Sequence, residues 1–211
     1  MQTTQLNSCD YERVAELHIQ GIPFGFLSSM GVKFLSALYV AVDDHCDSAL
    51  FVARDDRGEV AGFLAGTVSV KGFYKYALTR HFLKLIVPVI SKLFSLQVAK
   101  RIFETLLYPF SKQKNQEIAT NDVHCELLSV AVSGSLRGRG IGKKLVADFE
   151  SFLTNKGVTG EYKVVTSAED SRSNAFYKSA GFVLYHEFIH HENRMNEYRK
   201  TLVRVDSADG K

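Results

Sequence analysis

The stretch from residue 127 to residue 153, LLSVAVSGSLRGRGIGKKLVADFESFL, constrains the fold more than any other part of the chain. It begins with an apolar run in which Val130 and Val132 favour a β-strand, because β-branched side chains pack well on a pleated surface. After a turn, apolar residues recur at helical spacing: Leu145, Val146, Phe149 and Phe152. The stretch therefore predicts a strand, a turn and a helix, in that order.

The turn is rich in glycine and in basic residues. Gly138, Gly140 and Gly142 carry no Cβ atom, so the backbone can come close to a ligand. The N–H groups of the first helical turn have no partner within the helix, and the helix dipole favours an anion at that end. Basic side chains surround the turn: Arg137, Arg139, Lys143 and Lys144. We expect a diphosphate to bind here.

Two familiar phosphate loops do not fit the turn. A Walker A loop requires the spacing GxxxxGK followed by Ser or Thr, but the spacing from Gly138 to Gly142 is one residue short and Lys144 replaces the hydroxyl residue. A dinucleotide-binding turn requires GxGxxG, whereas these glycines are spaced as GxGxG. The sequence therefore indicates neither a magnesium–nucleotide site nor a Rossmann site.

Two motifs in this half of the chain resemble those of the GCN5-related N-acetyltransferase (GNAT) superfamily. Its pyrophosphate loop has an Arg or Gln, two residues, a Gly, one residue and a Gly or Ala, which Arg137, Gly140 and Gly142 match. Residues 172–182, RSNAFYKSAGF, are similar to a second family motif that follows the loop. The chain is therefore identified by resemblance as a member of this superfamily.

The resemblance is good over residues 45–70 and 123–203, loose over the first forty residues and nearly absent from residues 72–122. It implies an α/β (α+β) fold with a mixed, mostly antiparallel central sheet that is flanked by helices. In that fold the fourth and fifth strands splay apart. We expect a single GNAT-like domain over residues 1–211, with a helical insertion at about 72–122 between the third and fourth strands.

The resemblance also implies acetyl-CoA as the acyl-donor cosubstrate, with no metal. Backbone groups of Val130, Ala131 and Val132 would pair with the pantetheine arm as an added strand does. Backbone N–H groups from Arg137 through Lys143 would bind the pyrophosphate. The implied cofactor-binding residues are Val130, Ala131, Val132, Arg137, Gly138, Arg139, Gly140, Ile141, Gly142, Lys143, Asn174 and Tyr177.

Tyr177 and Glu126 are the expected catalytic residues. Tyr177 lies at the family position that often protonates the leaving thiolate, and a tyrosine with a pKa near ~10 stays protonated at neutral pH. Glu126 matches the position of the base in the histone-acetylating branch of the family. The alternative for Tyr177 is a purely structural role, packed with Phe176 and Phe182 on an apolar helix face.

The reaction needs a base, because an ammonium must lose its proton before the nitrogen attacks a thioester. Glu126 is the first candidate, His124 is the second, and a water chain is the third. Alternation along a strand places His124, Glu126, Leu128, Val130 and Val132 on one face, so either side chain could reach the cleft. The alternative for Glu126 is a solvated side chain near the start of a strand.

Composition and charge indicate one globular domain. Of the 211 residues, 45% are hydrophobic, and no linker rich in Pro, Ser or Gly divides them. The net charge of +3 is too small to indicate nucleic-acid binding. Cys9, Cys46 and Cys125 lack metal or disulfide spacing, and the first residues form no apolar signal segment, so we expect a cytoplasmic protein.

Periodicity and turn residues predict the remaining elements. Helices are expected at residues 8–20, 31–42 and 171–180. Strands are expected at residues 49–54, 59–70, 123–132, 161–167, 182–190 and 195–203, of which 59–70, 123–132 and 161–167 would be the third, fourth and fifth. The run from Asp55 to Gly58 predicts a hairpin turn.

The insertion is basic and apolar. Residues 60–103 contain seven basic residues and no acidic residue. Apolar residues nearly encircle the helices predicted between Phe82 and Leu107, so these helices need cover. Their uncharged runs are far shorter than the ~20 residues that span a bilayer. We expect a lid over the acceptor site, a homodimer surface, or a peripheral contact with anionic lipid through residues 72–110.

Residues 186–190 spell HEFIH, which matches the HExxH motif of zinc hydrolases. That motif works on a helix, where His186 and His190 would share a face. The aromatic and β-branched residues around it favour a strand instead. On a strand the two residues would lie about 13 Å apart, too far for one zinc ion. A metallohydrolase is therefore a remote alternative.

The function that fits these motifs is acetyl-CoA-dependent N-acetyl transfer to a primary amine, by direct attack in a ternary complex. A small molecule such as an amino sugar is the first candidate acceptor, because no acidic cluster marks a groove for a lysine peptide and the enlarged helical insertion indicates a partly enclosed acceptor. A protein or peptide amine is the second. A noncatalytic acyl-CoA-binding sensor is a further hypothesis, which the presence of Tyr177, Glu126 and Asn174 opposes.

Overall fold

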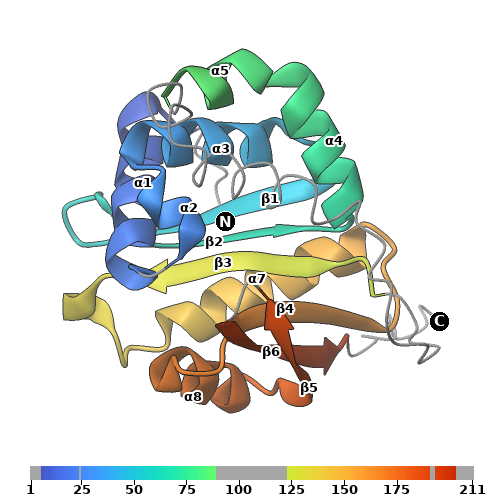
Figure 1. The fold of residues 1–211 in the computed structure, drawn as a ribbon. Coiled ribbons are helices and arrows are strands. Elements are labelled where there is room, and N and C mark those ends of the chain that lie inside the picture. Colours follow the sequence, from blue (N-terminus) through green and yellow to red (C-terminus); the bar gives the residue numbers. More distant parts are fainter. Residues whose placement is uncertain (1–5, 24, 89–122, 191–192, 203–211) are drawn as a thin grey trace, which may run out of the picture.

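The computed structural model describes residues 6–23, 25–88, 123–190 and 193–202. A twisted sheet of six strands forms the centre of this part of the molecule (Figure 1). The strand order is β1-β2-β3-β4-β6-β5. The strands are β1 (Ser48–Arg54), β2 (Val60–Thr67), β3 (Glu126–Val132), β4 (Glu161–Ser167), β5 (Val183–His190) and β6 (Asn193–Thr201). All neighbouring strands are antiparallel except β3 and β4, which confirms the mixed, mostly antiparallel sheet.

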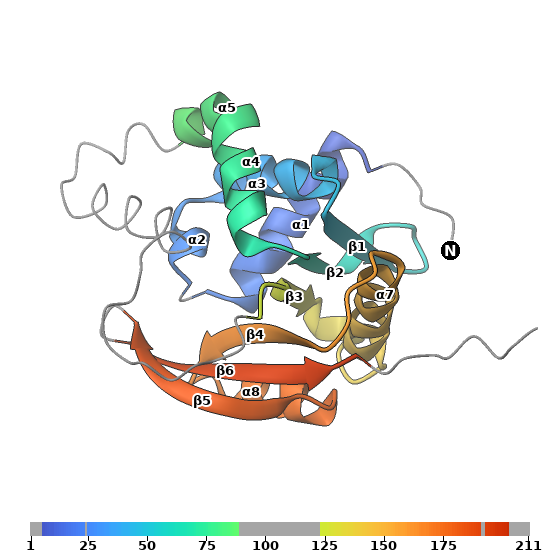
Figure 2. The same ribbon diagram turned by 90° about the vertical axis from the view of Figure 1, so that its right-hand side faces the viewer.

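Helices cover both faces of the sheet (Figures 1 and 2). One face carries α1 (Ser8–Gly21), α2 (Phe26–Ser29), α3 (Val32–Asp44), α4 (Val70–Arg80) and α5 (Phe82–Ile86). The other face carries α7 (Ile141–Asn155) and α8 (Ser171–Ser179), and a short 3-10 helix, η3 (Gly134–Leu136), precedes α7. Each face has its own apolar core, because alternate side chains of the strands point to opposite sides: Phe63 joins the first core and Leu64 joins the second.

The sheet opens between β3 and β4, as the resemblance implies. Glu126 and Lys163 form the single backbone pair between these strands in the described part of the sheet. The N–H group of Lys163 donates to the carbonyl oxygen of Cys125 at 3.0 Å. Beyond this point the two parallel strands separate, so the rest of β3 has an edge that faces β4 without pairing to it.

A β-bulge in β3 changes the face on which its side chains lie. Adjacent residues of β2 pair with Ser129 and Leu127, so Leu128 is the extra residue. Leu128 and Ser129 therefore point to the same side, toward α3, whereas Val130 and Val132 pack against the core below α7. The expectation that Glu126, Leu128, Val130 and Val132 share one face was wrong, because the bulge interrupts the alternation that it assumed.

The bounds of most predicted elements are confirmed to within a few residues. The strand expected at 59–70 ends at Thr67 instead, because Ser69 caps α4: its hydroxyl accepts from the N–H group of Gly72 at 3.1 Å. The four-residue helix α2 was not expected. The strand of residues 123–132 begins at Glu126, and His124 precedes it.

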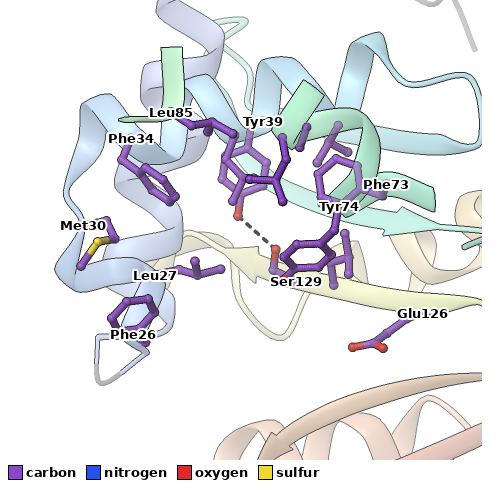
Figure 3. Close-up of a pocket in the computed structure, with 16 residues that line it drawn as sticks. Phe26, Leu27, Met30, Phe34, Tyr39, Phe73, Tyr74, Leu85, Glu126 and Ser129 are labelled. Carbon is purple, nitrogen blue, oxygen red and sulfur yellow. Dashed lines mark hydrogen bonds between the residues drawn. The ribbon is translucent and has the colours of Figure 1, made fainter. Parts of the chain in front are cut away.

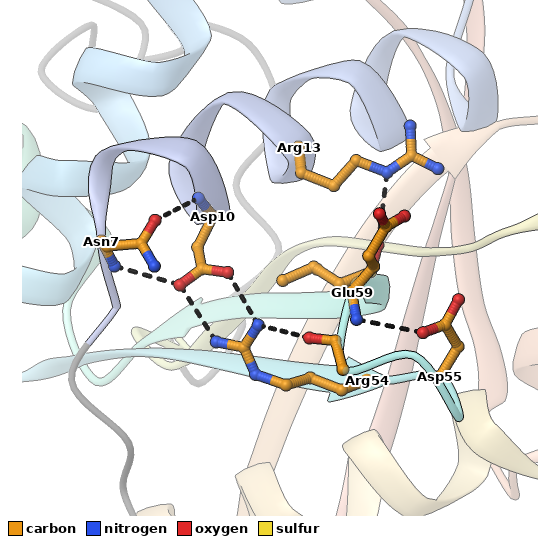
Figure 4. A network of polar contacts seen from close by, with 8 residues as sticks. Asn7, Asp10, Arg13, Arg54, Asp55 and Glu59 are labelled. Atoms are coloured by element: carbon orange, nitrogen blue, oxygen red, sulfur yellow. Dashed lines mark hydrogen bonds and ion pairs between the residues drawn. The ribbon is translucent and has the colours of Figure 1, made fainter.

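The β1–β2 hairpin and helix α1 are tied together by a polar network (Figure 4). In the hairpin turn, Gly58 has a φ of 80°, a conformation that glycine adopts without strain. Arg54, at the end of β1, donates through both terminal nitrogens to the carboxylate of Asp10, at 2.8 and 3.0 Å. Asp10 and Asn7 form a capping box at the start of α1. The buried carboxylate of Asp10 therefore joins α1 to the first strand.

The insertion lies between β2 and β3, which are the third and fourth strands of the family order. Its described part is α4 and α5, and residues 89–122 lie outside the described residues. No described helix is both long and apolar enough to cross a membrane. The helices predicted between Phe82 and Leu107 are described only at α5, and the single-domain organisation over residues 1–211 stays a prediction.

Candidate active site

The glycine-rich turn brings the chain from the end of β3 to the start of α7. Gly138 and Gly140 have φ angles of 77° and 79°, and a Cβ atom at either position would meet no atom within 4 Å. Gly140 is the N-cap of α7, and no described side chain caps that helix. The first N–H groups of α7 are therefore open to an anion, as the sequence predicted.

Gly142 also serves packing, and its contact with the cofactor stays a prediction. A Cβ atom at this position would lie 2.8 Å from the ring of Phe176 on α8. The absence of a side chain at Gly142 thus lets α8 pack against the first turn of α7.

Arg137 holds the turn against the strand that precedes it. Its Nε donates to the carbonyl oxygen of Val132 at 3.0 Å. The N–H group of Ser133 donates to the carbonyl oxygen of Ala61 at 2.7 Å, so Ser133 turns its backbone toward β2. In an antiparallel ladder the direction alternates, so the groups of Ala131 also face β2, and those of Val130 and Val132 face the opening.

Glu126 lies where β3 and β4 begin to separate. Its carboxylate lies 4.0 Å from Nζ of Lys163, which lies equally far from the carboxylate of Glu197 on β6. Glu197 in turn accepts from Nε of Arg199 at 2.7 Å. Burial raises the pKa of Glu126 to about 7, while the charge of Lys163 opposes this shift and that of Glu197 adds to it. A carboxylate with this pKa can exchange a proton at neutral pH.

Tyr177 is buried in α8 on the other side of the opening. Its ring packs against Phe176, Phe182 and Tyr198, with centroids 5.3 to 6.0 Å apart. Burial raises the pKa of its hydroxyl, and the negative charges of Asp170 and Glu126 raise it further. The charge of Glu126 therefore reaches the Tyr177 hydroxyl, as its contribution to the pKa shift shows. This packing is what a purely structural role of Tyr177 would require, and the same burial also keeps the hydroxyl protonated.

Asn174 is fully engaged by the protein. Its Nδ2 donates to the carbonyl oxygens of Ser167, Ala168 and Asp170, at 2.9, 3.3 and 2.6 Å. Its Oδ1 accepts from Asn196 at 2.8 Å and from Tyr198 at 2.9 Å. Contact with the cofactor stays a prediction for this residue, and the observed bonds instead fix the loop between β4 and α8.

His124, the second candidate base, is exposed just before β3. Its carbonyl oxygen accepts from the N–H group of Val70 at 3.4 Å. Unlike Glu126, His124 is not among the residues that line the cavity beside β3, and which of the two is the base stays a prediction.

A cavity of about 160 Å³ lies beside Glu126, between the sheet and the helices of the first face (Figure 3). Fourteen of its sixteen lining residues are apolar or aromatic, and Glu126 and Ser129 are the other two. Apolar side chains come from α2, α3, α4 and α5 as well as from the sheet; those that Figure 3 labels are Phe26, Leu27, Met30, Phe34, Tyr39, Phe73, Tyr74 and Leu85. No sequence pattern indicates this cavity, because its walls come from segments far apart in the chain.

His186 and His190 lie on strand β5, so the predicted strand is confirmed and the helical premise of the zinc motif is absent. Elsewhere in the described residues, His45, Cys46 and Asp47 bring potential ligand atoms within 4.8 Å of one another. Nδ1 of His45 is hydrogen-bonded to Ser48 at 2.8 Å, and Asp47 is paired with Lys156 at 3.5 Å. These contacts account for both side chains without a metal.

Comparison with known families matches residues 105–182 to the model of the acetyltransferase (GNAT) family. The matched range contains β3, the glycine turn, α7, β4 and α8, and therefore both strands that border the opening and the helix that carries Tyr177. No curated protein matches the sequence.

Several solved structures share the fold. A protein assigned as a GNAT-family acetyltransferase from Desulfovibrio desulfuricans has a TM-score of 0.57 and 14% identity, over 94% of this chain and 96% of its own. An aminoglycoside 6'-N-acetyltransferase in complex with coenzyme A has a TM-score of 0.56 and 13% identity, over 97% of both chains. A histone acetyltransferase HPA2 and related acetyltransferase from Corynebacterium glutamicum has a TM-score of 0.55 and 16% identity, over 98% and 97%. At these identities the likeness concerns the fold alone.

Proposed function

We propose that the chain is a GNAT acyltransferase that transfers the acetyl group of acetyl-CoA to a primary amine by direct attack in a ternary complex, because residues 105–182 match the model of that family and GNAT structures share the fold. The observation that carries the proposal is the opening between β3 and β4, which leads along the free edge of β3 to the uncapped start of α7. An extended amide chain fits the free strand edge, and a pyrophosphate fits the helix start.

The residues of the opening fit that cosubstrate. Val130 and Val132 turn N–H and C=O groups toward the opening, although the carbonyl oxygen of Val132 already accepts a hydrogen bond from Arg137. Gly138 and Gly140 leave the helix start without side chains in the way. Bound here, acetyl-CoA would supply the thioester that the amine attacks.

Glu126 is proposed as the base. With a pKa of about 7 it is partly ionised at neutral pH, so it can take a proton from an ammonium, directly or through a water. Lys163 stabilises the ionised form, and Glu197 opposes it.

Tyr177 is proposed as the acid that returns a proton to the leaving thiolate. Its raised pKa keeps it protonated, and its position across the opening from Glu126 separates the acid from the base. The proposed mechanism therefore keeps the two proton transfers on different elements, β3 and α8.

The proposed acceptor is a small molecule, because the cavity beside Glu126 is enclosed by α4 and α5 of the insertion as well as by α2 and α3. This arrangement supports the expectation of a lid over the acceptor site. A protein or peptide amine stays the second class of acceptor. A homodimer, a peripheral membrane contact through residues 72–110 and a cytoplasmic location stay predictions.

The test is calorimetric titration of the purified protein with acetyl-CoA, CoA and ATP, followed by thiol release with a panel of amines. We expect both thiol cofactors to bind in the micromolar range and ATP not to bind, with thiol release that depends on an amine. Failure of both cofactors to bind would contradict the proposal. Binding without turnover on any amine would favour the noncatalytic sensor instead.

A further inference from the structure

The walls of the cavity offer almost nothing to a polar acceptor. Ser129, one of the two lining residues that are neither apolar nor aromatic, is hydrogen-bonded to the hydroxyl of Tyr39 at 3.0 Å. That hydroxyl also contacts Nδ1 of His18, so the side chains of Ser129, Tyr39 and His18 form one hydrogen-bonded chain. Burial lowers the pKa of His18 to about 4, so this chain is neutral at pH 7. The hydroxyl groups of a sugar would lose water here and find few partners.

The cavity has the size of an aromatic ring. Its volume of about 160 Å³ is close to that of a dry apolar cavity of ~150 Å³ that admits benzene. Phe34, Phe73 and Leu85 are buried around it, and they supply the close apolar contacts that favour a ring or a short alkyl chain.

One charged group marks where the polar end of such a ligand would lie. Glu126 is the one acidic or basic side chain among the sixteen described lining residues, and it stands at the opening where β3 and β4 separate. A carboxylate at one end of an apolar cavity is complementary to an ammonium at one end of an apolar molecule.

From this arrangement we infer that the acceptor is a hydrophobic primary amine, an arylalkylamine or a short alkylamine, with its apolar end in the cavity and its nitrogen at Glu126. The inference rests on the proposed function and names the acceptor class of that same site. This acceptor class replaces the amino sugar that the sequence favoured. The insertion indicated an enclosed acceptor site, but the apolar lining of the cavity does not suit a sugar.

The insertion supplies a large part of this specificity. Phe73, Tyr74, Ala77 and Leu78 of α4 and Leu85 of α5 line the cavity, and they belong to the segment that departs most from the family pattern. Side chains of α4 can therefore change which acceptor is accepted without touching the glycine turn or Tyr177.

The first experiment measures kcat/KM for 2-phenylethylamine, hexylamine, ethanolamine, glucosamine and a lysine-containing peptide, with acetyl-CoA as the donor. Burial of an aromatic ring raises kcat/KM by at most about 100-fold, so we expect 2-phenylethylamine to exceed ethanolamine by roughly 30- to 100-fold. Hexylamine should also exceed ethanolamine, and glucosamine and the peptide should not.

The second experiment fills the cavity. Ala77 is buried and lines it, so Ala77→Leu should lower kcat/KM for 2-phenylethylamine by about 10-fold or more and change that for ethanolamine by less than about two-fold. Thr79→Leu, which adds the same residue at an exposed position of α4, is the matched control. Leu38→Phe fills the cavity from α3 and serves if Ala77→Leu unfolds, which thermal melting and acetyl-CoA affinity report.

Different failures are distinguishable. Preferred turnover of glucosamine or the peptide, with acetyl-CoA bound, would overturn this inference and leave the proposed function standing. A preference for octanoyl-CoA over acetyl-CoA that Ala77→Leu removes would mean that the cavity holds an acyl chain, and would also overturn it. Loss of acetyl-CoA binding and of all thiol release would instead remove the proposed function itself.

Discussion

The carboxylate of Glu126 lies 4.0 Å from Nζ of Lys163, and the same two residues form the last backbone pair before β3 and β4 separate. The position of the proposed base and the position of the opening are therefore fixed by one contact between two strands. Lys163 also lies 4.0 Å from Glu197, so one cation serves two carboxylates.

Replacing Lys163 with Met should move the pH profile of the enzyme. The charge of Lys163 lowers the pKa of Glu126, so its loss should raise that pKa from about 7 and shift the acidic limb of kcat/KM to higher pH, by about one unit. Lys178→Met, at an exposed position of α8, is the control. If the acidic limb of kcat/KM, measured from pH 5 to 9, stays at the same pH, Lys163 does not affect the group that titrates.

Replacing Glu126 with Gln should lower turnover by about 10²- to 10⁴-fold, because the proton of the amine loses its acceptor. His124→Gln should leave turnover unchanged; the reverse outcome would make His124 the base.

The same Glu126→Gln variant should be more stable than the native protein at pH 8. The folded-state pKa of Glu126 is raised, so the carboxyl group favours the folded state while protonated and loses this contribution as pH rises from about 4.5 to about 7. Melting temperatures measured at pH 4 and pH 8 should differ between the two proteins only at pH 8. A variant that melts lower than the native protein at pH 8 would contradict the raised pKa.

Replacing Tyr177 with Phe should lower turnover by roughly ten- to a thousandfold and leave the affinity for acetyl-CoA nearly unchanged. The matched control is Tyr162→Phe, because Tyr162 is also buried but gives its hydroxyl to Glu150 at 2.6 Å on α7. Single-turnover kinetics separate the chemical step from product release. An unchanged chemical step would leave Tyr177 with its packing role alone.

Replacing Gly140 with Asp should abolish binding of acetyl-CoA in calorimetry, because it places a negative charge at the anion site. Gly157→Asp is the matched control, since Gly157 has a similar positive φ of 73° at the far end of α7 and is equally open. Both variants carry the same backbone strain. Equal losses of affinity would assign the effect to that strain rather than to the charge.

Replacing Asp10 with Ala should lower the free energy of unfolding by about 3 kcal/mol and the melting temperature by roughly 10 °C, because Arg54 is left without its bidentate partner. The hydrogen bond from Arg54 lowers the pKa of Asp10, so its stabilising effect is present above the ordinary carboxyl pKa and is lost as the pH falls through the lowered value. Asp148→Ala, which removes a surface pair with Lys144, should cost less than about 1 kcal/mol. Equal losses for the two variants would contradict this.

The sequence predicted the parts of the fold that local chemistry determines. The turn from Arg137 to Gly142 and the strand and helix around it are determined by glycine, β-branched residues and helical spacing, and the structure has them as expected. The bulge at Leu128 was not predictable in this way, because it arises from how β2 and β3 pair. Helix α2 is a single turn, too short for a periodic pattern.

The candidate site was predicted in part. Glu126 lies on the strand edge where the family resemblance placed it, but its partner Lys163 is 37 positions away and only the sheet brings them together. The cavity depends on side chains of α2, α3, α4, α5, β2 and β3, so no local pattern contains it. Asn174 and Gly142 matched a family motif, yet their observed contacts are within the protein, which a motif cannot distinguish from contacts with a ligand.

The bulge in β3 divides that strand between two tasks. Glu126, Leu128 and Ser129 line the cavity, whereas Val130 and Val132 pack under α7 and turn their backbone groups toward the opening. In the proposed mechanism, acceptor preference can therefore be redesigned through the cavity-lining residues of β3 and α4 without changing Val130 and Val132. Deletion of Leu128 would restore a regular ladder without exchanging the two faces, because Leu127 and Ser129 already pair with adjacent residues of β2.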